Sequence, residues 1–275
     1  MLQKKLFYLF FIFLVTASFA QVDTVWVRRY NGIGNDLDYG QAVAADASGN
    51  VYVTGRTCVG GGYDEFGTIK YNSNGDEVWV RRYNGTGVGD DYGNDLALDD
   101  SGNVYVTGAS TGIGYDYVTI KYSPNGDSVW VKRYNGPGND TDWPTAIAVD
   151  TAQNIYVTGF SYGVGGYSDM TTIKYNTYGN QLWVKRYNAP GAESYYGRAI
   201  VVDDFGNVYV TGESRSAGLI YDCITIKYGP NGDTLWVRAY NGPGGGEDWG
   251  RAIAVDDSGN VYVTGDSDGG GTGPD

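Results

Sequence analysis

The strongest constraint on the fold of this chain is a repeat of about 53 residues that occupies nearly the whole sequence. A segment of the form Trp-Val-Arg-Arg-Tyr begins at Trp26 and returns in steps of 53, 51, 53 and 53 residues. Its later copies begin at Trp79, Trp130, Trp183 and Trp236. A second segment, Val-Tyr-Val-Thr-Gly, begins at Val51 and returns with the same steps. Repeats of roughly 40 to 50 residues with several short strands are typical of propeller blades rather than helical solenoids.

Each repeat contains four strand-like runs separated by turn signals. In the first repeat they lie at 42–45, 51–54, 66–71 and 78–83. A tight turn is expected between the first two runs and an Asn-Gly hairpin between the last two. No segment after residue 20 has a helical period. The sequence therefore predicts an all-β propeller of four-stranded blades, with Val, Ile, Tyr and Trp stacked between them. Four blades are complete and a partial fifth follows, as part of a larger ring.

The composition narrows the range of functions. Histidine is absent, which excludes His-based catalytic triads, His general bases and His metal ligands. The formal net charge is −13, so nucleic acid and anionic membrane surfaces are poor partners. The sequence indicates no catalytic residue, no cofactor and no metal site.

The first twenty residues have the pattern of a secretory signal peptide. Lys4 and Lys5 precede an apolar run at 6–15, and Ser18 and Ala20 are small residues at the positions that a signal peptidase reads. A membrane anchor is the alternative, but the run is shorter than the roughly 20 residues that cross a bilayer. We therefore expect a signal peptide at 1–20 and a propeller domain at 21–275. The mature chain would be secreted or displayed at the cell surface, without insertion into a membrane.

The two cysteines, Cys58 and Cys223, lie at places that are not equivalent in the repeat. Export permits a disulfide between them, but two unpaired thiols are the favoured interpretation.

The repeat resembles a known bacterial family. Residues 256–265 read Asp-Asp-Ser-Gly-Asn-Val-Tyr-Val-Thr-Gly, and Ile-Lys-Tyr, Asn-Gly-Asp and Trp segments accompany this motif in the earlier units. This pattern is similar to the seven-bladed beta-propeller repeat (SBBP) family over residues 22–275. The resemblance implies a secreted or cell-surface bacterial protein, and no single activity, because fold does not supply function.

The chain departs from the family pattern after Gly265, where no third or fourth strand follows. The segment at Trp26 is of the fourth-strand type and would pair with the last unit in a closed ring. The favoured interpretation is that the sequence is a fragment whose gene continues in frame past Asp275. A ring that closes with one defective blade is the alternative.

One position of the repeat, immediately before the innermost strand, combines an acid with an aromatic residue in four of the five units. A ring of such side chains near the channel mouth would suit sugars, which stack on aromatic faces and donate hydrogen bonds to carboxylates. The alternative is that the rings pack between blades while the acids cap turns. The residues concerned are Asp38, Tyr39, Asp91, Tyr92, Asp142, Trp143, Tyr196, Asp248 and Trp249.

Two further acidic features stand out. Asp95 lies where the other units have Ala, so it is either a ligand contact or, as we favour, a solvated residue of the channel. Turns of the Asp-Ser-Gly-Asn type invite a calcium interpretation, but they lack the further acids of a cation loop, so structural hairpins are favoured.

Two functions remain after these exclusions. The first is a non-catalytic binding or scaffold module for a glycan or an extracellular protein. The second is a carbohydrate-active enzyme that uses paired carboxylates such as Glu247 with Asp248, or Asp90 with Asp91. Catalysis needs two non-equivalent groups at one place, whereas this chain repeats nearly the same residues in every unit. The repetition favours binding.

Overall fold

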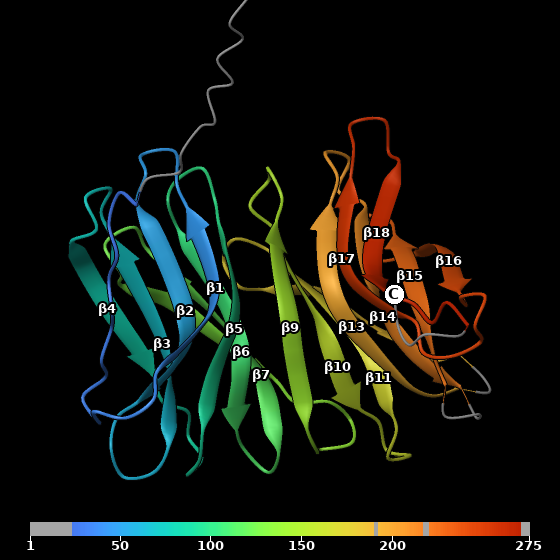
Figure 1. Ribbon diagram of the computed structural model, residues 1–275, viewed down its shortest axis with the longest axis horizontal. Helices are drawn as coiled ribbons and strands as arrows, with labels where there is room; N and C mark the ends of the chain where they lie inside the picture. Colours follow the sequence, from blue (N-terminus) through green and yellow to red (C-terminus); the bar gives the residue numbers. More distant parts are fainter. Residues whose placement is uncertain (1–23, 190–191, 217–219, 271–275) are drawn as a thin grey trace, which may run out of the picture.

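The chain forms an open arc of β-sheets that follow one another in sequence order (Figure 1). The computed structural model describes residues 24–189, 192–216 and 220–270, so the expected signal peptide at 1–20 lies outside the described residues. Four antiparallel sheets have four strands each, and a fifth has two. The described residues contain no helix, and hence none that could cross a membrane. The all-β architecture, with four complete blades and a partial fifth, is confirmed.

The strands of each blade pair in sequence order, so that neighbours along the chain are neighbours in the sheet. Blade 1 consists of β1 (Tyr39–Ala45), β2 (Val51–Cys58), β3 (Asp64–Tyr71) and β4 (Glu77–Tyr83). Blade 2 consists of β5 (Asp91–Leu98), β6 (Val104–Thr111), β7 (Tyr115–Tyr122) and β8 (Ser128–Tyr134). Blade 3 consists of β9 (Asp142–Val149), β10 (Ile155–Tyr162), β11 (Ser168–Tyr175) and β12 (Gln181–Tyr187). Blade 4 consists of β13 (Ala192–Val202), β14 (Val208–Ser216), β15 (Tyr221–Tyr228) and β16 (Thr234–Tyr240), and blade 5 of β17 (Trp249–Val255) and β18 (Val261–Asp266).

Apolar side chains fill the interfaces between blades. Successive side chains of a strand point to opposite faces of the sheet. The Val and Tyr residues of each second strand therefore pack against the blades on opposite sides. Blades 1 and 2, for example, share a core that includes Tyr52, Trp79, Val106 and Ile120. Similar cores join blades 2 and 3 and blades 3 and 4. The predicted stacking of Val, Ile, Tyr and Trp between blades is confirmed.

Each first hairpin is organised by one aspartate. In blade 2, Asp99 Oδ1 accepts the amides of Ser101 and Asn103, and Asp99 Oδ2 accepts the Asn103 side chain and the Tyr105 hydroxyl at 2.8 and 3.0 Å. Gly102 has a φ of 77°, which a glycine adopts without strain. Asp46, Asp203 and Asp256 make the same set of bonds. These aspartates therefore act as turn residues.

In blades 1 to 3 the fourth-strand tryptophan fastens its blade to the next one. Trp79 Nε1 donates to the Pro124 carbonyl at 3.2 Å, and its ring lies where a Cβ on Gly126 would clash. Trp130 and Trp183 make the equivalent contact to Thr177 and Pro230. The glycine of each second hairpin therefore serves two purposes, since it also takes a positive φ.

The two ends of the arc remain apart, and the ring is open (Figure 1). Trp26 contacts blade 1 in the same way that Trp79 contacts blade 2. Its Nε1 donates to the Ser73 carbonyl at 3.1 Å. The segment 24–37 nevertheless forms no strand, because the sheet that it would complete has no third strand among the described residues. Cys58 and Cys223 are both free thiols.

Candidate functional site

Aromatic side chains mark the start of the innermost strand in every blade. These strands are β1, β5, β9, β13 and β17, which neighbour one another along the arc (Figure 1). None of the five rings is fully buried, and Tyr39 is 41% exposed. The rings are Tyr39, Tyr92, Trp143, Tyr196 and Trp249.

A β-bulge in each innermost strand sets the direction of these rings. The bulge lies directly after the aromatic residue, as between Gly93 and Asp95 in β5. Opposite it, the second strand always has glycine, because a Cβ on Gly108 would lie 1.8 Å from the Tyr92 carbonyl oxygen. Gly55, Gly159, Gly212 and Gly265 face the same restriction, at 1.7 to 2.1 Å. The final glycine of the Val-Tyr-Val-Thr-Gly motif therefore permits the bulge that positions the aromatic residue.

In blades 1 to 3 the rings form a continuous cluster. The Arg56 guanidinium lies 3.9 Å from the centroid of Tyr39 and 5.7 Å from that of Tyr92. Tyr92 and Trp143 are 5.3 Å apart between centroids, and Tyr115 lies 5.7 and 5.3 Å from them. Edge-to-face and tilted contacts at these distances are favourable and hold the rings in fixed orientations.

In blades 3 to 5 the same arc continues. Phe160, the cross-strand neighbour of Trp143, packs edge-on against Tyr196 at 5.0 Å. Tyr221 bridges Tyr196 and Trp249, with centroid distances of 6.4 and 6.2 Å. We call the complete set the aromatic arc. It comprises Tyr39, Arg56, Tyr92, Tyr115, Trp143, Phe160, Tyr196, Tyr221 and Trp249.

In blades 4 and 5 an arginine–carboxylate pair joins the first strand to the second. Arg198 binds Glu213 with both its Nε and a terminal nitrogen, and Arg251 Nε binds Asp266 at 2.6 Å. Burial on its own would lower the pKa of Arg198, but the bonds to Glu213 outweigh it and raise that pKa. Arg251 also lies 4.5 Å from the Trp249 centroid.

A cavity of about 180 Å³ opens between these groups. It is lined by Tyr196, Arg198, Glu213, Tyr221, Trp249 and Arg251. Nη1 of Arg198 and both terminal nitrogens of Arg251 have no hydrogen-bond acceptor within the described ranges. The cavity thus combines aromatic faces with unused guanidinium donors.

The aspartates at the neighbouring position point the other way, into the loops. Asp142 is fully buried, and its Oδ2 accepts the Gly136 amide at 2.5 Å. Burial raises the pKa of Asp142, opposed by the Gly136 amide and the Ser161 hydroxyl. Asp91 and Asp248 are equally buried and bind the Gly85 and Gly242 amides, and Asp38 binds the amides of Gly32 and Cys58. Because side chains alternate along a strand, one residue of each pair holds the loop and the other joins the arc.

Asp95 accepts hydrogen bonds from two backbone amides. Its Oδ2 accepts the Ile147 amide of blade 3 at 2.9 Å, and its Oδ1 accepts the Leu96 amide at 2.8 Å. Burial raises the pKa of Asp95, and the two amides offset this only in part. Asp95 therefore bridges the innermost strands of two blades.

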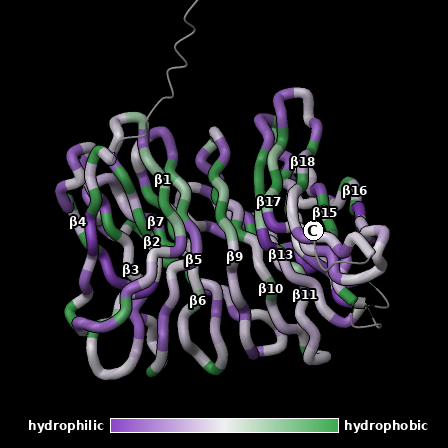
Figure 2. Tube along the Cα trace, in the orientation of Figure 1, coloured by the Kyte–Doolittle hydropathy of each residue, from purple (hydrophilic) through white to green (hydrophobic). Residues whose placement is uncertain are grey.

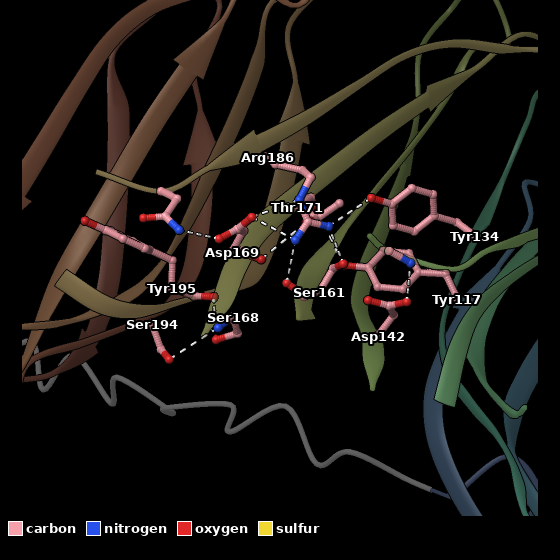
Figure 3. A network of polar contacts seen from close by, with 12 residues as sticks. Tyr117, Tyr134, Asp142, Ser161, Ser168, Asp169, Thr171, Arg186, Ser194 and Tyr195 are labelled. Atoms are coloured by element: carbon pink, nitrogen blue, oxygen red, sulfur yellow. Dashed lines mark hydrogen bonds and ion pairs between the residues drawn. The ribbon is translucent and has the colours of Figure 1, made fainter. Parts of the chain in front are cut away.

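A network of polar contacts joins blade 3 to both of its neighbours (Figure 3). Arg186 binds Asp169 at 2.7 and 2.8 Å, donates to the Ser161 hydroxyl, and reaches the Tyr134 hydroxyl of blade 2 at 3.0 Å. On the other side, the Ser168 hydroxyl donates to the Tyr195 carbonyl of blade 4 at 3.4 Å. These hydrogen bonds therefore join blades 2, 3 and 4.

The paired carboxylates proposed for catalysis do not converge. Asp90 accepts the Asp64 amide and the Tyr92 hydroxyl, whereas its neighbour Asp91 faces the loop. Asp248 is buried in its loop and Glu247 is exposed. Neither pair forms an acid and base across one cavity.

Sequence reasoning found the five repeated rings but missed their partners. Arg56, Tyr115, Phe160 and Tyr221 come from second and third strands, where the repeats differ from one another. Comparison at the position of Arg198 and Arg251 would have shown Gln41, Asn94 and Thr145 in the other blades. This difference between the repeats was the sequence feature that could have indicated the cavity.

Comparisons with known proteins agree with this architecture. The sequence matches the family described as "Beta-propeller repeat" (SBBP) over residues 25–60, 78–115, 129–167, 182–219 and 238–271. A search of curated proteins found none that matches.

Solved structures with a similar fold include a periplasmic gluconolactonase of Pseudomonas aeruginosa, with 12% identity and a TM-score of 0.51. That match covers 82% of this chain and 62% of the gluconolactonase, so this chain spans less than two thirds of its length. A protein of unknown function from Dyadobacter fermentans has 10% identity, a TM-score of 0.52, and coverage of 86% and 77%. At these identities the likeness concerns the fold alone. The five matched repeats cover most of the sequence, and the chain therefore belongs to the beta-propeller repeat (SBBP) family.

Proposed function

We propose that this chain is an exported, non-catalytic binding module that holds a neutral glycan along the aromatic arc. The observation that carries the proposal is the row of partly exposed rings on the innermost strands, in which ring contacts link blades 2 to 5 and Arg56 links Tyr39 of blade 1 to Tyr92. Sugar rings present apolar faces that stack on such side chains, and a platform of fixed orientation binds at a lower entropic cost.

The cavity between blades 4 and 5 is suited to anchor one sugar ring. Its volume of about 180 Å³ is below the roughly 300–1,000 Å³ of sites for drug-sized ligands, so it holds a single ring rather than an oligomer. Trp249 and Tyr196 offer aromatic faces, and the free guanidinium nitrogens of Arg198 and Arg251 can donate to hydroxyls.

The charge around this cavity favours a neutral ligand. Three arginines are outnumbered by four carboxylates, so no excess of positive charge faces a ligand; the groups are Arg198, Arg215 and Arg251 with Glu193, Glu213, Glu247 and Asp266. The whole chain carries −13, so a polyanion would meet repulsion over a wide surface. Export rests on the signal-like pattern of residues 1–20, which agrees with an extracellular or cell-surface glycan as partner.

A glycan array carrying neutral and acidic oligosaccharides tests the proposal. We expect neutral glycans to bind, and Trp249→Ala to weaken the best of them about tenfold, as truncation of a central contact residue does. Tyr178→Ala is the matched control, because Tyr178 is an exposed ring on the β11–β12 hairpin, outside the arc. An array without hits, or with acidic hits only, would overturn the proposal and leave a protein-binding scaffold as the alternative.

A further inference from the structure

The cavity between blades 4 and 5 lies at the start of two innermost strands. In β13 and in β17 an aromatic residue is followed two positions later by an arginine, as Tyr196 is by Arg198 and Trp249 by Arg251. Figure 2 shows β17 changing from hydrophilic at its start to hydrophobic toward its end. Two aromatic–arginine pairs from neighbouring blades therefore line one cavity at the polar ends of their strands.

Carboxylates hold both guanidinium groups in place. Arg198 donates from Nε and Nη2 to Glu213, and Arg251 donates from Nε to Asp266 at 2.6 Å. Arg251 also lies 4.5 Å from the ring centroid of Trp249. These bonds leave Nη1 of Arg198 and both terminal nitrogens of Arg251 as donors, and fixed donors bind a ligand at a lower entropic cost.

The cavity offers few acceptors to match these donors. Among the described residues that line it, Glu213 is the only carboxylate. Glu213 is 3% exposed, and both of its oxygens already accept from Arg198. The cavity therefore favours a ligand group that accepts hydrogen bonds from the arginines and brings no donor of its own to that place.

A carbonyl oxygen meets this requirement better than a sugar hydroxyl does. Its two lone pairs can accept one N–H from Arg198 and one from Arg251, and it carries no hydrogen that needs an acceptor. A hydroxyl in the same place would bring a hydrogen that finds no free carboxylate, and an unpaired polar group is costly where water is excluded. Hydrogen bonds from an ionised donor are also the stronger kind.

We infer that this cavity binds the acetamido group of an N-acetylated hexosamine, an inference that rests on the proposed binding of neutral glycans. The carbonyl oxygen accepts from Arg198 and Arg251, and the methyl group lies against the aromatic faces of Tyr196 and Trp249. Because the amide is trans, its N–H points to the side opposite the carbonyl, away from the guanidinium groups. The group is uncharged, which suits a cavity where carboxylates outnumber arginines.

A matched pair of trisaccharides, tri-N-acetylchitotriose and cellotriose, tests the inference. They share one backbone and one linkage, and they differ only in carrying an acetamido group or a hydroxyl beside each anomeric carbon. In calorimetric titrations of the full chain, we expect the acetylated trisaccharide to bind about tenfold more tightly. That is the preference supplied by one net hydrogen bond to a charged group.

Arg251→Met separates the hydrogen bond from stacking. Methionine keeps an apolar side chain beside Trp249 but has no donor, and the Arg251–Asp266 pair is exposed, so the variant should fold. We expect the preference for the acetylated trisaccharide to fall from about tenfold to about twofold. Arg28→Met is the matched control and should keep the preference. Arg28 also lies beside a tryptophan and pairs with an exposed carboxylate, that of Asp76, but it lies outside the arc.

Three results would overturn the inference. Equal binding of the two trisaccharides would do so and leave glycan binding itself standing. A preference that persists undiminished in Arg251→Met would assign it to stacking of the methyl group alone. Binding of neither trisaccharide would also exclude the acetamido group, and the glycan array then decides separately whether the proposed function fails with it.

Discussion

At the scale of single residues, adjacent positions in this repeat perform opposite tasks. Asp142 is buried and holds a loop, whereas Trp143 joins the aromatic arc. The sequence analysis predicted both residues near the channel mouth, because residues that recur at the same point of each repeat occupy the same place in each blade. The sequence did not reveal which way each side chain points. That direction depends on the alternation of side chains along the strand and on a bulge that the glycine of the second strand permits.

Gly108→Ala tests the role of that glycine. A Cβ there would meet the Tyr92 carbonyl oxygen at 1.8 Å, and neither backbone can move without breaking the sheet. We expect urea unfolding to show a loss of about 3 kcal/mol, the upper end of the usual cost of overpacking. Gly165→Ala is the control, since its nearest neighbour would lie at 3.9 Å. Equal stability of the two variants would contradict the bulge argument.

The hairpin aspartates predict a pH dependence. Burial alone would raise the pKa of Asp203, but hydrogen bonds from Asn207, Tyr209 and the Phe205 amide outweigh it, so the pKa is lowered. A lowered pKa contributes stability above the unfolded value near 3.9, and this is lost as the pH falls through the folded pKa. Asp203→Asn should therefore cost about 1–2 kcal/mol near pH 6 and progressively less below about pH 4. A difference from wild type that persists unchanged to pH 2 would refute this assignment.

At the scale of elements, turn chemistry and alternation predicted the strands well, and the errors have physical causes. The second run was expected at 51–54, but β2 extends to Cys58 because Arg56 and Thr57 continue its pairing with β3. The first run was expected at 42–45, but β1 begins at Tyr39, on the far side of the bulge. Irregular sequence around a bulge hides the start of a strand from pattern analysis.

The Arg186 network shows how elements of neighbouring blades are fastened together (Figure 3). Arg186→Gln would leave Asp169 almost buried with only Asn188 as a side-chain partner. We expect a loss of about 3 kcal/mol, because an uncompensated buried charge is costly. Asp76→Asn should cost less than about 1 kcal/mol, since the Arg28–Asp76 pair is long and exposed. Thermal or urea unfolding of both variants checks the contrast, and equal losses would contradict it.

At the scale of the whole molecule, the repeat predicted blade number and blade order, because each unit carries all the contacts that fasten it to the next. Trp26 makes its interblade bond to Ser73 although its own sheet is incomplete. What the sequence analysis did not predict is the difference in side chains between the two ends of the arc. Blades 1 to 3 have unrelated residues at the positions of Arg198, Glu213 and Arg251. An analysis of what the repeats share therefore overlooks these three residues.

The central claim is that the ligand meets the aromatic arc and not the adjacent aspartates. The measurement that tests it most directly is the affinity of Trp143→Ala and Asp142→Ala for an oligosaccharide selected on the array, together with their unfolding free energies. Trp143→Ala should lose about tenfold in affinity and less stability than a fully buried ring would, because the ring is partly exposed. Asp142→Ala should keep its affinity and lose about 1–3 kcal/mol of stability, because the Gly136 amide loses its buried acceptor. The reverse pattern, with binding lost in Asp142→Ala and retained in Trp143→Ala, would contradict the account.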